Sequence, residues 1–163
     1  MMDGSGQVTT SGGRTFSAAI NSGSPRPRQL LLADVTGKGE LVALASDGRQ
    51  VLLFAVSGCS FVPVQNAQGQ QYTFDLGFTG YGTGVGCVDA NVDGTTDLVG
   101  LKYGPESQGE GTIQRTIVEL TGPHARNGAT DSVPASNATM ADEAQSVSCG
   151  DLTLARDGVS SGP

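Results

Sequence analysis

Aromatic and catalytic side chains are scarce in this chain. It has no tryptophan, aromatic residues make up 5% of its 163 residues, and His124 is its only histidine. Because one histidine without any Cys-x-x-Cys pair does not supply the usual set of zinc ligands, a zinc site of that kind is excluded. His124 lies in a polar segment that we expect to be a solvated loop, and we predict that this chain is not an enzyme by itself.

Long apolar runs and positive charge are also in short supply. The longest apolar run, Val51–Val56, is far below the roughly 18–20 residues that a membrane span requires. Nine Lys and Arg residues stand against 16 Asp and Glu residues, which leaves a net charge of −7. An acidic chain repels phosphate backbones, so nucleic acid is not an expected partner and divalent cations are favoured. The start of the chain lacks the apolar core of a signal peptide, and we interpret the sequence as the mature part of a secreted protein whose export signal has been removed.

The three cysteines allow at most one internal disulfide. Cys87 and Cys149 occupy matching positions of the repeat described below, whereas Cys59 and Cys87 form the more local pair. Three buried thiols are the third possibility. The sequence leaves these alternatives open.

Glycine is abundant, at 25 residues, and no stretch of the chain has a sustained helical period. Glycines serve tight turns, so this composition favours an all-β class with short antiparallel strands. Residues 1–28 are rich in Gly and Ser and end in a Pro-x-Pro segment, and we predict a flexible N-terminal segment or an edge strand there. Residues 29–163 are predicted to form a β-repeat domain.

A strand–turn–strand pattern occurs twice in that domain. Residues 30–44 read as an apolar strand, a turn and a second apolar strand, and residues 86–101 follow the same order. A third copy is predicted to begin at Ser148. The repeats therefore lie near 29–83, 84–145 and, in part, 146–163, a period typical of propeller blades or other stacked arrays.

Further elements follow from local patterns. Strands are predicted at 51–56, 72–76 and 112–120, the second with Tyr72, Phe74 and Leu76 on one side. A hairpin turn is predicted at 65–70 and a glycine-rich loop at 77–86. Residues 123–144 are polar, and we predict a long loop or partial disorder there.

The turn of the second copy carries the clearest chemical motif. Oxygen-bearing side chains alternate along it, Gly94 supplies a sharp bend, and a last aspartate closes the set. This is the oxygen-rich shell that Ca²⁺ prefers, at about 6–8 ligands. An EF-hand is excluded, because its twelfth loop position requires Glu and here is Gly100. The predicted Ca²⁺ ligands are Asp89, Asn91, Asp93, Asp97 and the carbonyl oxygen of Thr95.

This motif, followed by Asp97-Leu98-Val99, resembles the calcium loop of FG-GAP and VCBS-type repeats, including those of integrin α-subunit propellers. The resemblance covers roughly residues 29–122 and extends in part to residues 146–158. It implies antiparallel sheets that are blades of a β-propeller, with about two complete repeats and a partial third. It also implies an extracellular module that binds a protein or glycan ligand and uses Ca²⁺ as a structural ion. Alternatives are a self-assembling structural subunit and an accessory domain of a secreted hydrolase or lyase.

Two further predictions concern the assembly of the repeats and the turn of the first repeat copy. A closed propeller typically needs at least four blades, so two repeats are expected to form a homo-oligomer or to cover their own sheet edges. In the first turn Asp34 and Thr36 match the motif, but Lys38 stands where the second turn has Asp93. We predict that this turn is free of ion, with the Lys38 ammonium paired to Asp34 or Glu40.

Overall fold

The computed structural model describes residues 5–9, 15–20, 23–58, 60–76, 83–105 and 111–161. The fold is all-β with antiparallel sheets, as predicted. Its elements are β1 (Ser5–Thr9), β2 (Thr15–Ala19), β3 (Arg28–Asp34), β4 (Leu41–Ser46), β5 (Gln50–Ser57), β6 (Ser60–Pro63), β7 (Thr73–Asp75), β8 (Thr83–Val88), β9 (Asp97–Gly104), β10 (Thr112–Thr121), β11 (His124–Pro134), α1 (Ala138–Glu143), β12 (Ser148–Cys149), β13 (Leu152–Thr153), α2 (Leu154–Asp157) and β14 (Val159–Ser161).

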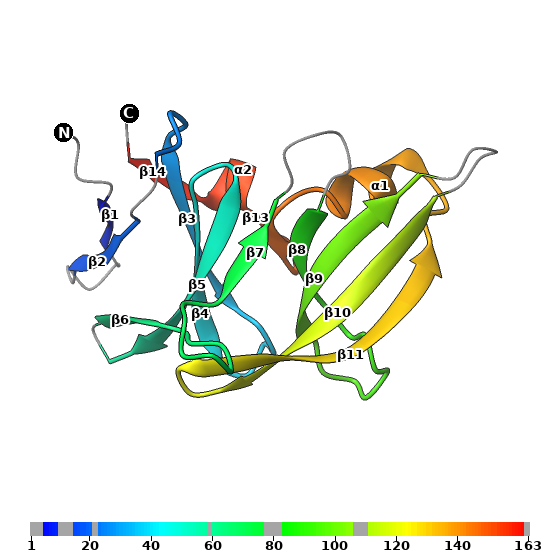
Figure 1. Ribbon diagram of the computed structural model, residues 1–163, viewed down its shortest axis with the longest axis horizontal. Coiled ribbons are helices and arrows are strands. Elements are labelled where there is room, and N and C mark those ends of the chain that lie inside the picture. Colours follow the sequence, from blue (N-terminus) through cyan, green and yellow to red (C-terminus); the bar gives the residue numbers. More distant parts are fainter. Residues whose placement is uncertain are drawn as a thin grey trace.

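Two larger sheets dominate the molecule (Figure 1). In the first, β3, β4, β5 and β6 follow one another as a meander, β14 adds to the free edge of β3, and β7 pairs with β5. In the second, β8, β9, β10 and β11 form a four-stranded meander. Sequential antiparallel strands need only short connections, so the many glycine-containing turns suit this topology.

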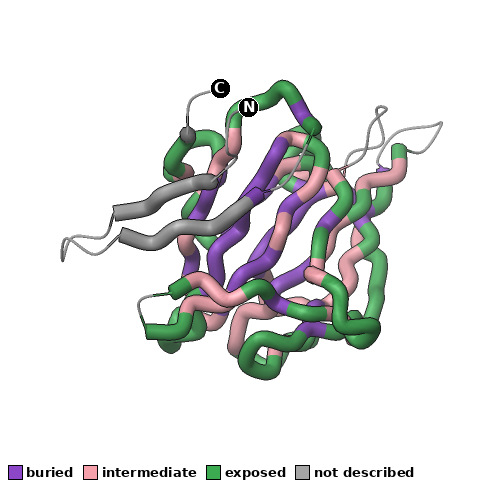
Figure 2. Tube along the Cα trace, turned by 60° about the vertical axis from the view of Figure 1, so that its left-hand side comes forward, coloured by how far each residue is buried: buried purple, intermediate pink, exposed green. Residues whose placement is uncertain are grey.

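The main core lies between these two sheets and is largely aliphatic. Leu44 and Leu53 of the first sheet pack in one cluster with Val85 and Leu98 of the second, and all four are fully buried. Figure 2 shows the buried positions running along adjacent strands. Phe74 joins this cluster with Tyr72 and Leu76 packed against it, which confirms the predicted one-sided pattern of residues 72–76.

The first sheet is buried on its other face as well. A second cluster gathers Ile20, Leu30, Ala43, Ala45 and Phe54. A strand covered on both faces carries a near-continuous apolar run rather than an alternating one. This accounts for the run Val51–Val56, whose predicted strand is confirmed within β5.

Residues near the C-terminus cover the first strand of each sheet. β14 pairs with β3 from Val159↔Leu30 to Ser161↔Arg28. The segment before β12 lies along β8, where the Val85 N–H donates to the Ser146 carbonyl at 2.9 Å. A disulfide joins Cys87 to Cys149, which decides the pairing that the sequence left open.

The prediction of a loop or disorder at residues 123–144 is wrong. Gly122, at φ 56°, and Pro123 make a tight turn, after which β11 pairs with β10 from Thr121↔His124 to Thr112↔Pro134, with a bulge between Thr116 and Val118. Cross-strand ion pairs join Arg115 to Asp131 and Glu119 to Arg126. Polar residues form a strand here because it is an edge strand that is largely exposed to water and pairs through its backbone. Helix α1 follows, capped by Asn137, whose Oδ1 accepts a bond of 2.9 Å from Met140 N.

The predicted loop at 77–86 is also wrong in part. Residues 77–82 lie outside the described residues, but β8 begins at Thr83. Gly84 lies within this strand. A larger residue does not fit there, because a Cβ atom would lie 2.5 Å from the Ser146 carbonyl oxygen and 2.6 Å from that of Ala144. This glycine therefore permits the close approach of two chain segments rather than a loop.

The structure bears on two further predictions, the hairpin turn at 65–70 and the third copy of the repeat. The hairpin turn at 65–70 is confirmed by hydrogen bonds from Asn66 N to Gln70 O at 2.7 Å and from Gly69 N to Asn66 O at 3.0 Å. The residues of the predicted third copy take a different form from the first two, since β12 and β13 make a two-residue hairpin that leads into α2.

Candidate functional site

The loop between β8 and β9 holds all five predicted Ca²⁺ ligands, and we call residues 89–97 the second loop. It lies at the lower right of Figure 1. Its aspartates fold it around their own side chains: Asp89 Oδ1 accepts from Asp93 N at 3.0 Å, and Asp89 Oδ2 accepts from Gly94 N at 2.9 Å. Asn91 Oδ1 accepts from the same Asp93 N–H at 3.0 Å. The side-chain oxygens of Asp89 and Asn91 therefore converge on one point inside the turn.

Backbone conformation in this loop is unusual. Gly94 has φ 86°, which glycine adopts freely, but Val92 has φ 61° and is the only non-glycine residue with positive φ among the described residues. A left-handed conformation costs an L-residue about 1–2 kcal/mol, and a β-branched one is an outlier there. The Val92 side chain is 86% exposed, so packing does not offset this cost. Backbone strain of this kind is typical of a functional segment.

Asp97 closes the loop from the start of β9. Its Oδ2 accepts from Ala90 N at 3.3 Å. Burial raises the pKa of Asp97, and the nearby charges of Asp93 and Asp89 raise it further, against a lowering by the Ala90 hydrogen bond. The Asp97 carboxylate is thus close enough to be repelled by those of Asp89 and Asp93.

The fit of this loop to a cation depends on its donor types and on their geometry. Within the described residues, no three His, Cys, Asp or Glu side chains are gathered in the geometry of a metal site. The donor types do fit: three carboxylates, one amide oxygen and one backbone carbonyl are the hard oxygen ligands that Ca²⁺ takes. Carboxylate oxygens that accept one backbone hydrogen bond keep a second lone pair for an ion.

The raised pKa of Asp97 predicts a pH effect with a definite sign. A carboxyl whose pKa is higher in the folded than in the unfolded state stabilises the fold below its unfolded pKa, and this contribution is lost as pH rises through the folded pKa. At neutral pH and without metal, Asp97→Asn should therefore raise the melting temperature, because it removes the cost of burying a charged carboxylate and the repulsion from Asp89 and Asp93. The gain should disappear at a pH below about 3, where aspartates are protonated. Thermal melts in EGTA at both pH values measure it, and a lower melting temperature for the variant at neutral pH would contradict the repulsion.

The loop between β3 and β4, residues 34–40, is a structural copy of the second loop, and we call it the first loop. Its fourth and sixth residues, Gly37 and Gly39, have φ 71° and 100°, at the positions of Val92 and Gly94. Asp34 Oδ2 accepts from Gly39 N at 2.7 Å, as Asp89 Oδ2 does from Gly94. Thr36 Oγ1 accepts from Lys38 N at 3.2 Å, as Asn91 Oδ1 does from Asp93. Over their first six residues the two loops thus share the positions of positive φ and two side-chain-to-backbone hydrogen bonds, despite their different side chains.

Lys38 does not pair as predicted. Its Nζ donates to Thr95 Oγ1 of the second loop at 3.4 Å, and no ion pair joins it to Asp34 or Glu40 within the part of the chain that the structure describes. The loops lie side by side, and Thr96 Oγ1 donates to the Val35 carbonyl. The two loops are distant in the sequence, so local patterns do not reveal that the Lys38 ammonium faces the second loop.

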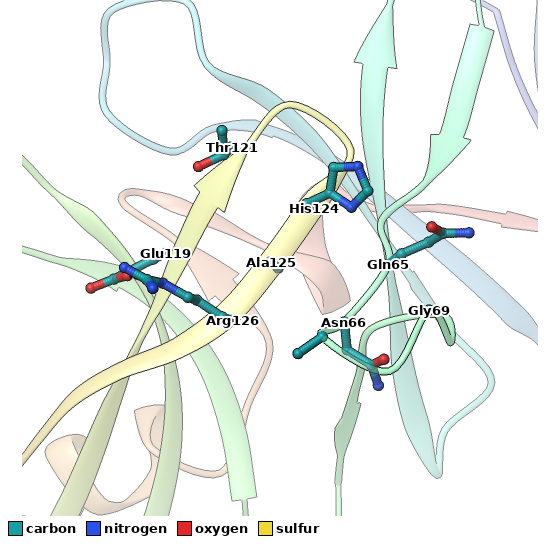
Figure 3. Close-up of a pocket in the computed structure, with 9 residues that line it drawn as sticks. Gln65, Asn66, Gly69, Glu119, Thr121, His124, Ala125 and Arg126 are labelled. Carbon is teal, nitrogen blue, oxygen red and sulfur yellow. The ribbon is translucent and has the colours of Figure 1, made fainter.

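A groove of 380 Å³ lies between the 65–69 turn and the hairpin of β10 and β11. In Figure 3 the Glu119–Arg126 ion pair stands on one side, and His124 and Gln65 lie toward the other end. Two backbone bonds of 2.9 Å, from Gln65 N to Pro123 O and from Ala125 N to Gln65 O, hold the walls together. The residues around the groove are Gln65, Asn66, Ala67, Gly69, Glu119, Thr121, His124, Ala125 and Arg126.

The groove continues past Ala67 and Ala125 into a second hollow of 460 Å³ that reaches Tyr72 and Asn127. Burial raises the pKa of Tyr72, whose hydroxyl lies 2.6 Å from Asn127 Oδ1. Sequence reasoning missed this surface, because its two walls are more than 50 residues apart and neither carries a motif. His124 is exposed at the start of β11 and lines this groove together with Glu119 and Thr121.

Comparisons with protein-family models, with curated proteins and with solved structures found no match. Among the described residues, no helix is both long and apolar enough to cross a membrane.

Proposed function

We propose that this chain is an extracellular β-repeat module in which the second loop binds one structural Ca²⁺ through Asp89, Asn91, Asp93, Asp97 and the Thr95 carbonyl. The observation that carries the proposal is the strained turn itself. Val92 holds a left-handed conformation although it is 86% exposed, and in the same loop the Asp97 carboxylate is repelled by those of Asp89 and Asp93. A bound cation offsets both costs at once, since it removes the repulsion and stabilises the turn.

The sheet organisation supports an arrangement like propeller blades. Each of the two meanders has four consecutive antiparallel strands, and each places its loop between its first two strands. Loops with the same conformation at the same place in successive meanders favour an internal duplication. Because β14 and the segment before β12 cover the first strands of these sheets, self-coverage of edges is favoured over assembly through those strands.

We further propose that the module binds a protein or glycan ligand and that it is not itself an enzyme. The groove beside Gln65 and Arg126 offers amide, imidazole and guanidinium groups around a floor of small alanines, a surface suited to a polar ligand. A self-assembling structural subunit and an accessory domain of a secreted hydrolase or lyase remain the alternative roles. A homo-oligomer in light scattering would favour the first of these.

Calcium binding should appear as a rise in melting temperature. At a Ca²⁺ concentration 100-fold above Kd, binding to the folded state adds roughly 2.7 kcal/mol, or about 5–10 °C for a domain of this size. Asp93→Ala should abolish most of the rise, because it removes a charge and a central ligand. Glu40→Ala is the matched control in the first loop and should keep the full rise.

The measurement is a thermal melt in EGTA and in millimolar Ca²⁺, with calorimetry to count the bound ions. Mg²⁺ should raise the melting temperature far less, because it requires a tight octahedron and releases water reluctantly. Equal melting temperatures with and without Ca²⁺ in the wild type, with no heat of binding, would show that the loop is an ion-free aspartate turn.

A further inference from the structure

Negative charge is concentrated where the two loops meet. The first loop contains Asp34 and Glu40, the second contains three aspartates, and Lys38 is the one cationic residue in either loop. The sum over the two loops is five negative charges and one positive charge, or −4, against −7 for the whole chain. The position of this single ammonium therefore matters for any cation that approaches the second loop.

The Asp34 carboxylate is a second candidate partner for the Lys38 ammonium. Asp34 Oδ1 is buried and has no hydrogen-bond partner among the described residues. In the second loop the equivalent atom, Asp89 Oδ1, accepts the backbone N–H of Asp93, but the Lys38 N–H donates to Thr36 instead. A buried carboxylate oxygen without a donor is costly, and it favours a cation beside it.

The side chain of Lys38 starts only four residues from Asp34, within one turn whose Gly39 N–H already binds the other oxygen of that carboxylate. Its ammonium nevertheless lies on Thr95, the residue whose carbonyl is a proposed Ca²⁺ ligand. One flexible ammonium therefore lies beside an acidic loop and belongs to the same turn as a carboxylate oxygen that has no donor among the described residues.

We propose that Lys38 is a tethered counter-ion that moves between the loops: it lies against the second loop when Ca²⁺ is absent and returns to Asp34 when Ca²⁺ binds. This inference rests on the proposed function of the second loop. Without metal, the ammonium offsets part of the repulsion among Asp89, Asp93 and Asp97. Ca²⁺ repels it, and Asp34 then receives the donor that it lacks. Lys38 thus lowers the Ca²⁺ affinity of the second loop, and Asp34 limits that reduction.

Isothermal titration calorimetry with Ca²⁺ on the full chain tests both halves. Lys38→Gln should bind Ca²⁺ about three- to tenfold more tightly at low salt, since a unit charge several ångströms from a divalent ion is removed, and high salt should reduce the difference. Asp34→Asn keeps an acceptor for Gly39 N but removes the charge that draws the ammonium away, so it should weaken binding about two- to fivefold. Lys102→Gln, an exposed lysine on β9, is the control for net charge and should leave Kd unchanged.

Melts in EGTA give a second readout. Lys38→Gln should lower the melting temperature without metal and yet show a larger rise on adding Ca²⁺, whereas a purely structural role would lower both states equally. If the wild type binds Ca²⁺ and Lys38→Gln binds it equally or more weakly, the inference about Lys38 is overturned and the proposed function of the second loop stands. An unchanged Kd in Asp34→Asn would overturn the return of Lys38 to Asp34. A wild type that binds no Ca²⁺ would overturn the proposed function and this inference together.

Discussion

Removing the Cys87–Cys149 bond is expected to lower the free energy of unfolding by about 4 kcal/mol in the chain-entropy treatment of a loop of this length. The bond closes 62 residues, which include the second loop and all of β9, β10 and β11. The unfolded chain gains the most freedom when a long loop opens. The double variant Cys87→Ser/Cys149→Ser, unfolded in urea beside the oxidised wild type, measures the difference.

Cys59→Ser is the matched control, because it removes a cysteine and leaves the bond in place. Cys59 lies outside the described residues, and the midpoint of this variant should stay close to that of the wild type because the Cys87–Cys149 bond is retained. Thiol counting in denaturant without reductant should find one free thiol in the wild type, since two of the three cysteines are paired. Three free thiols in protein made in an oxidising compartment would contradict the bond.

Gly84→Ala is expected to destabilise the fold by about 1–3 kcal/mol, at the upper end of overpacking effects. The new Cβ would meet two backbone carbonyl oxygens, of Ser146 at 2.5 Å and of Ala144 at 2.6 Å, and backbone cannot move aside as a flexible side chain can. The segment at 144–147 should separate from β8 as a result. Urea unfolding gives the loss in stability, and amide hydrogen exchange at Val85, whose N–H binds Ser146 O, locates it.

Gly104→Ala is the control in the same sheet. Its nearest neighbours to a new Cβ are atoms of Thr112 at 3.8 and 4.0 Å, which is ordinary contact. That variant should keep most of the wild-type stability and the protection of Val85. Equal losses for Gly84→Ala and Gly104→Ala would mean that residues 144–147 do not pack against β8 as closely as described.

Short-range patterns in this chain anticipated the elements that they specify directly. The alternation of Tyr72, Phe74 and Leu76 predicted which side of the segment packs on the core, and the 65–70 turn followed from its polar, glycine-containing composition. The spacing of Asp89, Asn91 and Asp93 predicted a turn wrapped around a cation, and the structure shows a turn in which Asp89 and Asn91 accept backbone N–H groups. Calcium in that turn is still a prediction.

The polar composition of residues 123–144 led to a wrong prediction of a loop or disorder. Edge strands need backbone pairing but little apolar surface, so β11 carries no hydrophobic signal for its strand. The ion pairs of Arg115 with Asp131 and of Glu119 with Arg126 join residues 16 and 7 positions apart, which periodicity does not register. The predicted loop at 77–86 was wrong at Gly84 for a related reason, because glycine, which lacks a side chain, suits both a loop and a close backbone contact.

By itself the sequence determined the all-β class, the strand–turn–strand repeat and the residue types of the second loop, because these depend on spacings of a few residues. The tertiary structure alone decided that Cys149 reaches Cys87, that Lys38 contacts Thr95 and that the groove walls at Gln65 and Ala125 meet. Each of these contacts joins segments more than 50 residues apart. Their geometry follows from how two sheets pack around one shared core, a property of the whole chain that no local pattern contains.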